Sequence, residues 1–492
     1  MSLFNQIKLP NGSIYHQPLG LFINNEMRPS ISGKTFPVVK LSSEEIIAHV
    51  YEAESVDVDA AVTAARLAFR SEWRTISPER RARLLSKVAD LMEENLELLA
   101  HLETLNNGKA IQLARGDVAH CVSVYKYYSG WADKVEGRVV DIDNQQFSYT
   151  TKEPFGVCGQ IIPWNSPLVS MAWKLGPALA AGNTVVLKTA EQTPLSALVV
   201  ARYFNDAGFP PGVLNVIAGL GHVAGKALAE QKDVNKIAFT GSTATGRAIM
   251  EAAAKSNLKP ITLELGGKGP NIVFDDANFE AALEWTSFGI FYNSGQVCAA
   301  GSRIYVQSRI YKRFLQALKD KAAAIVVGNP FNPNTFQGPQ TSQAQFDRVM
   351  EYIRDGINAG AKIETGGSRW GQKGYFVEPT IFSGASPSMK IMNEEIFGPV
   401  AVISEFHTED EAIEAANATD HGLASGIHTQ NLDRAIRVSR ALEAGTVWIN
   451  QYNAIHHQLP FGGKKQSGIG KELGEAALAS YTTIKSVSIR LN

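Results

Sequence analysis

Between residues 156 and 265, five short apolar runs alternate with four longer segments whose apolar residues have helical spacing. Parallel strands need long crossovers, which are usually helices, so this rhythm predicts a parallel, doubly wound sheet. The expected strands are Gly156–Ile162, Thr184–Lys188, Val213–Ala218, Lys236–Phe239 and Ile261–Leu265, and the expected helices are Pro167–Ala180, Thr193–Asp206, His222–Gln231 and Thr243–Ala254. Ligands bind such sheets beyond the carboxyl ends of the strands, so the segments that follow the strands are candidate site segments.

The sequence on either side of this sheet predicts an α/β fold with a second domain. Residues 1–55 are short apolar runs broken by proline and glycine, which predict strands and loops on the outside. Helices are expected over Asp57–Phe69, Pro78–Glu103 and Val118–Val135. A second α/β region is expected from Pro270 to about Asn450, with strands that include Asn271–Phe274, Ile304–Val306, Val400–Phe406 and Thr446–Ile449. A chain of 492 residues is long enough for two or three domains.

Two further segments alternate between apolar and polar residues but belong to neither region. They are Phe147–Lys152 and the tail Tyr481–Leu491. A strand with a free edge can pair with another subunit, and it can equally lie at the edge of a sheet within its own chain. Both interpretations stay open at this point.

The charge and composition argue against several classes of function. The formal net charge is −1 and no basic stripe is present, which argues against nucleic-acid binding. No apolar run reaches the roughly 18 residues that a membrane span needs. The three cysteines show no Cys/His spacing typical of zinc, so we expect no metal site and a reducing compartment. Since the N-terminus lacks the features of a signal peptide, the expected localisation is cytoplasmic, and the expected partners are small molecules or other subunits.

Cys298 lies in a stretch of small residues, Gly295–Arg303, between an amphipathic run and a β-branched and aromatic run. Small neighbours would let a substrate and a planar cofactor approach the sulfur. A lone cysteine is more often a core residue, because free cysteines are among the most buried residues. The residues alone therefore leave open whether Cys298 is a nucleophile or a packing residue.

Three strand ends carry motifs suited to a dinucleotide. Phe239–Gly246 places glycines and hydroxyls at a strand-to-helix turn, which suits a phosphate, although an ordinary helix cap fits equally well. Gly219–Gly225 resembles the GxGxxG fingerprint but is one residue too long. Glu191, shortly after Lys188, could accept hydrogen bonds from both hydroxyls of an adenosine ribose and repel a 2′-phosphate, which would favour NAD over NADP. A surface ion pair is the alternative interpretation of these two residues.

Two other strand ends carry polar groups suited to catalysis. Glu264 lies inside the apolar strand that opens Leu263–Lys268, and glutamate is rarely buried without a task or a partner. Asn165 lies in the constrained turn Pro163–Pro167, where its amide could donate to an oxyanion or form an Asx turn.

Seven segments, in this order, resemble the NAD(P)-dependent aldehyde dehydrogenase superfamily. They are Pro163–Pro167, Lys188–Pro194, Phe239–Gly246, Leu263–Lys268, Gly295–Arg303, Glu394–Val400 and Pro460–Gly463. The similarity runs from about residue 20 to 490 and looks closest to the non-acylating, broad-specificity class that includes the cytosolic and mitochondrial aldehyde dehydrogenases. It implies NAD-dependent oxidation of an aldehyde to the carboxylic acid. The implied fold has a Rossmann-like parallel-sheet NAD-binding domain, an α/β catalytic domain and a small β oligomerisation arm.

The resemblance implies roles for three catalytic residues. Cys298 would be the nucleophile that forms a thiohemiacetal and then a thioester. The Asn165 side chain and the Cys298 backbone N–H would hold the oxyanion. Glu264 would activate the water that hydrolyses the thioester and would help to deprotonate Cys298. Thr189 and Ala244–Thr245 depart from the usual family pattern, but neither change removes an implied contact.

The resemblance also implies which residues bind NAD. Lys188 and Glu191 would hold the adenosine ribose, and Ser242 would meet the pyrophosphate. Glu395 would bind the nicotinamide ribose, with Phe397 beside that end of the cofactor. The other implied cofactor-binding residues are Ile161, Ile162, Pro163, Trp164, Gly221, Gly225, Phe239, Gly241, Thr245, Gly246, Leu265, Gly266, Gln345 and Arg348.

The implied substrate tunnel is unusual in its polarity. Its positions are His120, Ser166, Ser170, Trp173, Val297, Ala299, Ile455, His456, His457 and Phe461. Close relatives are expected to carry aromatic residues or methionine at several of these, so the serines and histidines predict a substrate larger or more polar than a short alkanal. His456 and His457 are equally well explained as solvent-facing loop residues.

The expected domain boundaries follow the same pattern. The NAD-binding domain is expected over residues 1–133 and 155–266, the catalytic domain over 267–466, and the oligomerisation strands over 134–154 and 480–492. The resemblance implies a homo-oligomer, either a tetramer or a dimer, built through those strands.

Two other functions remain open. A CoA-acylating semialdehyde dehydrogenase also uses a cysteine, but that class as a rule lacks the glutamate base, so Glu264 argues against it. A non-catalytic structural protein could keep the same fold, and loss of Cys298 or Glu264 would have been its mark. Both residues are present.

Overall fold

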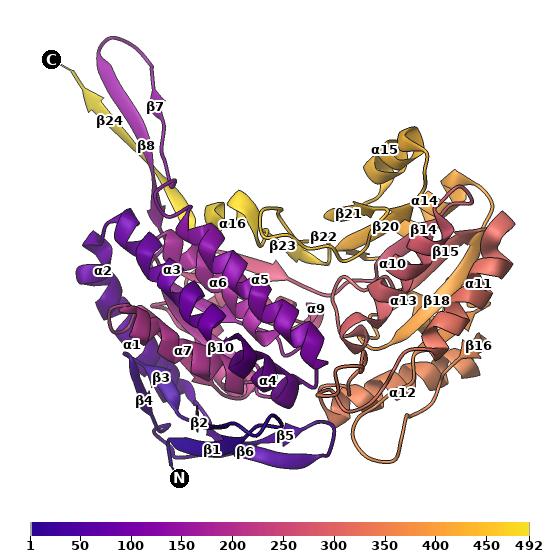
Figure 1. Cartoon of the computed structure of the whole chain (residues 1–492). Helices are drawn as coiled ribbons and strands as arrows, with labels where there is room; N and C mark the ends of the chain where they lie inside the picture. The colour runs from indigo at the N-terminus through magenta and orange to yellow at the C-terminus, as the bar shows by residue number, and fades with distance from the viewer. Residues whose placement is uncertain (1, 492) are drawn as a thin grey trace.

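The structure, a computed structural model, describes residues 2–491, and Figure 1 shows two lobes with a β arm projecting from one of them. One lobe is built on an eight-stranded sheet and the other on a seven-stranded sheet, which confirms the predicted α/β class. Met1 and Asn492, the outer ends of two predicted segments, lie outside the described residues. Within residues 2–491, no helix combines the length and apolarity needed to cross a membrane.

The first sheet has a parallel core of five buried strands. They are β9 (Val157–Ile161), β10 (Thr184–Thr189), β11 (Leu214–Ala218), β12 (Lys236–Thr240) and β13 (Ile261–Glu264). The strand order is β13-β12-β9-β10-β11, so the chain first builds outward from β9 and then returns to its other side. This reversal creates a topological switch point between β9 and β12, where such sheets bind ligands.

Helices connect the parallel strands as predicted, with one difference in type. They are α6 (Pro167–Ala180), α7 (Leu195–Ala207), a π-helical turn η1 (Gly221–Gly225) followed by α8 (Lys226–Glu230), and α9 (Thr243–Ser256). The helix expected over His222–Gln231 therefore begins as a π turn. At α9 the Ser242 hydroxyl accepts a hydrogen bond from the Thr245 N–H, so Ser242 is an N-cap.

The helices that precede this sheet are α1 (Ser55–Arg70), α2 (Glu72–Thr75), α3 (Pro78–Glu94), α4 (Leu96–Asn107) and α5 (Ile111–Ser129). The single helix expected over Pro78–Glu103 is two helices that meet at Asn95. The Asn95 amide donates to the Leu91 carbonyl at 2.8 Å, a side-chain bond that competes with the helical pattern. The helix expected over Val118–Val135 begins earlier, at Ile111, and ends at Ser129.

The N-terminal residues contribute to the sheet as well as to the surface. Two hairpins, β1 (Phe4–Lys8) with β2 (Ile14–Pro18) and β5 (Thr35–Lys40) with β6 (Glu45–Tyr51), lie apart from the main sheets. By contrast, β3 (Leu21–Ile23) pairs antiparallel with β11, is fully buried, and carries β4 (Glu26–Arg28) on its other side. The expectation that this whole region wraps the outside is therefore wrong for β3.

The second lobe forms around a mostly parallel sheet of order β16-β17-β18-β15-β14-β20-β21. The strands are β14 (Pro270–Val273), β15 (Arg303–Gln307), β16 (Lys362–Thr365), β17 (Thr380–Ser383), β18 (Val400–Phe406), β20 (Ala424–His428) and β21 (Thr446–Ile449). The helices are α10 (Phe279–Phe291), α11 (Ser308–Ala323), α12 (Gln343–Asn358), α13 (Lys390–Asn393), α14 (Glu409–Asn417) and α15 (Leu432–Ala441), with a 3₁₀ turn η2 (Tyr292–Gly295) after α10.

After the second lobe the chain returns to the first. The short strands β19 (His421–Gly422) and β22 (Lys464–Lys465) pair with each other, and β23 (Gly468–Ile469) joins the first sheet antiparallel to β13. Helix α16 (Gly474–Ala479) then leads into the arm.

The arm is a separate three-stranded antiparallel sheet. It contains β7 (Val139–Val140), β8 (Gln146–Pro154) and β24 (Thr482–Arg490), and β8 pairs with β24 along nine residues. The two segments singled out by their alternation therefore pair with each other. Phe147, Ile484 and Ile489 nevertheless remain exposed on the arm.

Candidate active site

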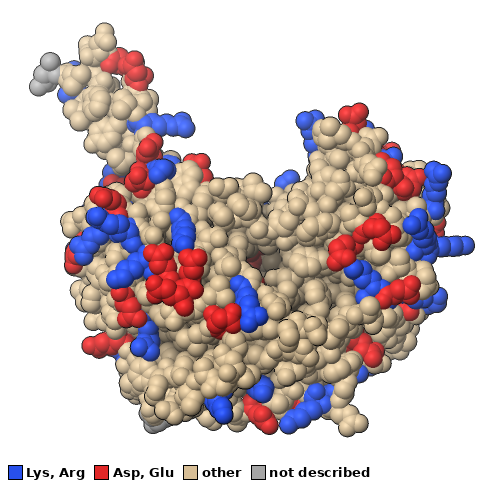
Figure 2. All heavy atoms as spheres, viewed as in Figure 1, with Lys and Arg blue, Asp and Glu red and all other residues tan. Residues whose placement is uncertain are grey.

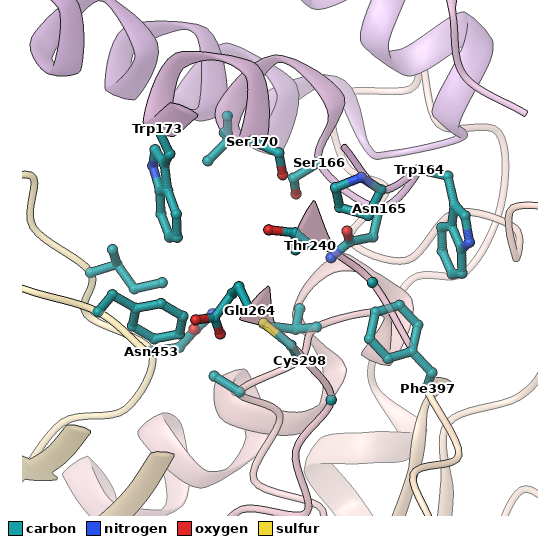
Figure 3. Close-up of a pocket in the computed structure, with 18 of the residues that line it drawn as sticks. Trp164, Asn165, Ser166, Ser170, Trp173, Thr240, Glu264, Cys298, Phe397 and Asn453 are labelled. Carbon is teal, nitrogen blue, oxygen red and sulfur yellow. The ribbon is translucent and has the colours of Figure 1, made fainter. Parts of the chain in front are cut away.

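A cavity of about 500 Å³ opens at the carboxyl ends of β9, β12 and β13 and is closed on its other side by loops of the second lobe. It therefore lies at the switch point of the first sheet, and its size is typical of small-molecule sites. Figure 2 shows the surface hollowed between the two lobes, with charges of both signs scattered around it. Asn165, Glu264 and Cys298 all line this cavity (Figure 3).

Cys298 is presented by a loop of strained backbone. Helix α10 ends just before it, and the three residues Asn293–Gly295 have positive φ values of 50°, 58° and 71°. The two that are not glycine each cost roughly 1 kcal/mol or more in this conformation. Hydrogen bonds such as that from the Ser294 hydroxyl to the Gly338 carbonyl, at 3.0 Å, hold the loop in place. The sulfur therefore lies at a fixed position, partly exposed to the cavity.

Glycines allow the cysteine loop and the strand ends to approach each other. A Cβ atom at Gly267 would collide with the Cys298 carbonyl, and one at Gly266 would collide with the Glu395 carboxylate. A Cβ at Gly295 would collide with the backbone at Gly398. The double glycine that follows Glu264 is therefore required by packing around the site.

The Asn165 side chain is held with its amide toward the cysteine loop. Its Nδ2 donates one hydrogen bond to the Gln296 carbonyl at 3.0 Å. The backbone carbonyl of Asn165 accepts hydrogen bonds from the side-chain amide of Asn293 at 3.1 Å and from that of Asn107 at 3.3 Å. Since an amide has two N–H groups, one donor remains for a group bound in the cavity.

Glu264 is a buried carboxylate at the end of β13. Its Oε1 has no hydrogen-bond partner within the described residues. Burial raises the pKa of Glu264 well above its usual value, the nearby Glu472 raises it further, and Lys174 and Lys471 oppose the shift. Lys174 and Glu472 form a buried ion pair behind it. A carboxyl with a raised pKa is well suited to accept a proton near neutral pH.

The thiol of Cys298 is held in its protonated form. Burial raises the pKa of Cys298 well above its usual value, and the neighbouring carboxylates Glu264 and Glu395 raise it further. A thiolate is the nucleophilic form, so attack requires a proton acceptor. Glu264 is the adjacent candidate, and Figure 3 shows its side chain beside Cys298.

A second group of polar contacts shapes the opposite end of the cavity. The Gly267 N–H donates to Glu395 Oε1 at 2.9 Å, and burial raises the pKa of Glu395 to about 7. Gln345 Nε2 donates to the carbonyl of Phe397 at 2.8 Å, and Arg348 donates to the carbonyl of Glu395 at 3.2 Å. The Phe397 ring meets the Trp164 ring edge-to-face, with centroids 5.1 Å apart. Gln345 and Arg348 therefore hold the loop that carries Glu395 and Phe397.

The remaining expected dinucleotide residues lie along the same edge of the first sheet. Lys188 is buried at the end of β10 and its Nζ donates to Glu191 at 3.0 Å. Burial lowers the pKa of Lys188, and Glu191 opposes that shift. A Cβ atom at Gly221 or Gly225 would meet nothing within 4 Å, although only Gly221 is exposed and Gly225 is buried.

The cavity brings together most, but not all, of the expected site residues. Of the expected cofactor residues, its lining includes Pro163, Trp164, Gly241, Ser242, Leu265, Gly266, Gln345, Arg348, Glu395 and Phe397. Those outside the lining are Ile161, Ile162, Lys188, Glu191, Gly221, Gly225, Phe239, Thr245 and Gly246. Of the expected substrate positions, His120, Ser166, Ser170, Trp173, Val297, Ala299, Ile455 and Phe461 line it. His456 and His457 do not: His456 is exposed, and the His457 ring packs near Tyr127 and His456.

Sequence reasoning missed eight lining residues: Gly116, Asp117, Val169, Lys174, Thr240, Phe288, Tyr292 and Asn453. Helical spacing could have found several of them. Val169 and Lys174 share a face of α6 with Ser166 and Ser170, and Asp117 precedes His120 by one turn of α5. Asn453 is in an irregular loop and carries no such signal.

No group of three or more His, Cys, Asp or Glu side chains in residues 2–491 is arranged to hold a metal ion.

Comparisons with known proteins agree on one family. The model of the aldehyde dehydrogenase family matches residues 28–487. An aldehyde dehydrogenase from Davidiella tassiana is 59% identical over 486 residues, covering 99% of this chain and 98% of its own length. Aldehyde dehydrogenase 1A1 from Homo sapiens is 50% identical over 475 residues, covering 96% and 95%. A solved NAD+ complex of an aldehyde dehydrogenase from Bacillus cereus superposes with a TM-score of 0.95 at 48% identity, covering 96% of this chain and 97% of that one.

Proposed function

The chain belongs to the aldehyde dehydrogenase family, and we propose that it uses NAD to oxidise an aldehyde to the carboxylic acid through a thioester on Cys298. The observation that carries the proposal is one cavity, at the switch point of the first sheet, lined by a cysteine, a free amide donor and an orphaned carboxylate. Assay of NADH formation by the purified protein with an aldehyde panel tests it.

The first part of the reaction uses Cys298 and Asn165. Glu264 takes the thiol proton and passes it to bulk water, and the thiolate attacks the aldehyde carbon to form a thiohemiacetal. The free N–H of the Asn165 amide and the Cys298 backbone N–H stabilise the oxyanion that develops on the former carbonyl oxygen. Loss of a hydride from this carbon leaves an acyl group bound to Cys298 as a thioester.

The second part of the reaction uses Glu264 as a general base. Its carboxylate removes a proton from a water molecule that attacks the thioester, and the acid leaves as Cys298 is regenerated. The raised pKa of Glu264 favours this role, because the carboxylate holds the abstracted proton readily. Neither a side chain nor a backbone group of the described residues occupies Oε1.

The residues at the sheet edge fit a dinucleotide. The N-terminus of α9 with Ser242, the backbone at Gly221 and Gly225, and the Lys188–Glu191 pair would hold its pyrophosphate and adenosine ribose. Glu395 would accept hydrogen bonds from the second ribose. Bound NAD supplies the acceptor for the hydride that leaves the substrate carbon. The solved Bacillus cereus relative holds NAD+, which supports this choice.

Asn165→Ala is expected to lower kcat by about 10²- to 10³-fold, because it removes a donor to the oxyanion. NAD binding, measured by fluorescence titration, should change little. Asn107→Ala is the matched control, since Asn107 supports the same turn through the Trp164 and Asn165 carbonyls but offers no group to the cavity. Equal losses in the two variants would show that Asn165 acts only in folding of the turn.

Glu191→Ala is expected to raise the ratio of kcat/KM for NADP to that for NAD by about tenfold, which corresponds to roughly 1.4 kcal/mol. The carboxylate is partly exposed, so its repulsion of a 2′-phosphate is screened and the effect is moderate. Steady-state kinetics with both cofactors measure the ratio. The exposed Glu230→Ala, on α8, serves as a control, and an unchanged ratio in Glu191→Ala would contradict the ribose assignment.

The division into an NAD-binding domain, a catalytic domain and an oligomerisation arm is part of the same proposal. The separate sheets of the two lobes support the first two, and the exposed Phe147, Ile484 and Ile489 support contact of the arm with another subunit. Light scattering distinguishes a dimer from a tetramer, and a monomer would contradict the role of the arm.

A further inference from the structure

The part of the cavity beyond Cys298 has one polar wall and one apolar wall. The polar wall is formed by α5 and the start of α6. It carries His120, Ser170 and the α6 N-cap Ser166, together with Val169 and Trp173 of α6. The apolar wall carries Val297, Ile455 and Phe461. Figure 3 shows Ser166 and Ser170 on α6, across the open space from Cys298 and Glu264. A substrate bound there would meet hydroxyls beside the Val169 and Trp173 side chains on one side and carbon along the other.

The two serines have hydrogen-bonding capacity left for a ligand. Ser166 Oγ accepts a hydrogen bond from Lys109 Nζ at 3.0 Å, so its own O–H is free to donate. Ser170 Oγ makes no hydrogen bond to the described part of the protein, although its residue is only half-buried. The Ser170 N–H bonds to the Ser166 carbonyl at 3.0 Å, so the two hydroxyls lie one helical turn apart.

His120 adds a further hydrogen-bond donor, because its contact with Trp173 defines the tautomer of the ring. The indole N–H of Trp173 donates to His120 Nε2 at 2.9 Å, and an indole can only donate. Nε2 is therefore unprotonated and the proton of the neutral ring lies on Nδ1, which has no partner among residues 2–491. Burial lowers the pKa of His120, with smaller contributions in the same direction from His457 and His456 against that of Asp117, so the neutral ring is the relevant form.

Asn453 supplies an acceptor to the same space. Its Oδ1 is buried and has no hydrogen-bond partner within the described chain, and the residue has a positive φ of 56° that fixes the loop. Since buried polar atoms are seldom left unpaired, this oxygen is suited to a ligand donor. Side chains with free donors and one with an unpaired acceptor thus line the same cavity, and a ligand hydroxyl can both donate and accept.

The charged groups in this part of the cavity are already paired. Asp117 is bonded to the buried Lys109, and Lys174 to the buried Glu472. A substrate carboxylate would meet no unpaired cation here and would lie near Glu264. A substrate ammonium would meet no unpaired carboxylate except the proposed base itself.

From these contacts we infer that the preferred substrate is an uncharged aldehyde that carries hydroxyl groups, recognised by Ser166, Ser170 and His120. This inference rests on the proposed function, because it concerns the same site. The hydroxyls of such an aldehyde pair with the wall formed by α5 and α6, while its C–H groups pack on Ile455 and Phe461. An alkanal of the same length leaves those polar groups unpaired.

The test compares matched aldehydes. Glyceraldehyde and propanal have three carbons and differ in their hydroxyls, whereas succinic semialdehyde and 3-aminopropanal add a negative and a positive charge. The expected order of kcat/KM is glyceraldehyde first, by about tenfold or more over propanal, and both charged aldehydes below propanal.

Ser170→Ala removes a hydroxyl with no structural partner and should lower the glyceraldehyde-to-propanal ratio of kcat/KM by about fivefold, with a further loss in Ser166→Ala/Ser170→Ala. Ser123→Ala, on the exposed face of α5, is the control and should leave the ratio unchanged.

The outcomes separate this inference from the proposed function. The substrate class is wrong if NADH forms from propanal and the ratio of kcat/KM for glyceraldehyde to that for propanal is near one. It is also wrong if Ser170→Ala does not change this ratio. In both cases the dehydrogenase activity is still supported. A preference for either charged aldehyde also overturns the substrate class. Absence of NADH formation with all four aldehydes overturns the proposed function and this inference with it. The thermal midpoint of each variant shows whether a changed ratio comes with a changed fold.

Discussion

Replacing Cys298 with alanine is expected to reduce aldehyde-dependent NADH formation by on the order of 10⁴-fold or more, the scale seen when a covalent nucleophile is lost. The reason is that no other thiol reaches the cavity. Cys121 and Cys158 are both buried, and burial raises the pKa of Cys158 to about 12. NAD affinity should be retained, because the expected cofactor contacts come from other residues.

The controls for this variant separate chemistry from folding. Cys158→Ala changes a buried cysteine in β9, so it should keep turnover close to wild type while showing any general effect of cysteine loss. Circular dichroism and titration with NAD show that Cys298→Ala is folded. Turnover above about 1% of wild type in folded Cys298→Ala would contradict the nucleophile assignment.

Replacing Glu264 with glutamine is expected to lower steady-state kcat by about 10²- to 10⁴-fold, the range for loss of a general base. Rapid-mixing absorbance should still show NADH formed in a single burst of about one per site, because the larger loss falls on thioester hydrolysis. The burst itself should be slower than in wild type, because Glu264 also takes the Cys298 proton. Glu475→Gln, on the exposed face of α16, should behave as wild type. Loss of the burst itself would instead place the main role of Glu264 in activating Cys298.

The pH dependence follows from the direction of the Glu264 pKa. The base is active as a carboxylate and its pKa is raised, so wild-type kcat should fall as the pH is lowered through a value well above 4.5. In Glu264→Gln, kcat should not show this fall as the pH is lowered. A raised pKa in the folded state also means that the carboxyl destabilises the protein as the pH rises through that pKa. The variant should therefore be at least as stable as wild type at pH 8, as measured by thermal unfolding.

The first sheet and most of the site could be predicted because both depend on local patterns. Strand-end motifs pointed to Asn165, Glu264 and Lys188, and parallel topology brings strand ends to one edge. The family resemblance then supplied Cys298 and Glu395, which come from the other lobe.

Other features depend on contacts between distant residues and left no local signal. The Lys174–Glu472 ion pair, whose charges act on Glu264, joins residues 298 positions apart in the sequence. The two-residue strand β23 is too short to show a pattern, yet it completes the edge of the first sheet beside β13. The break at Asn95 depends on one side-chain hydrogen bond that competes with an otherwise continuous helical spacing.

The proposed thioester on Cys298 can be tested for directly in Glu264→Gln, where hydrolysis is expected to be slow. The variant is mixed with NAD and propanal, quenched in acid during the burst, and measured by intact-protein and peptide mass spectrometry. We predict that the Cys298 peptide gains the mass of the aldehyde less two hydrogens, in an amount equal to the NADH formed, because an acyl group replaces the thiol hydrogen. NADH formation with no adduct, or with an adduct on another residue, would contradict a covalent mechanism at Cys298.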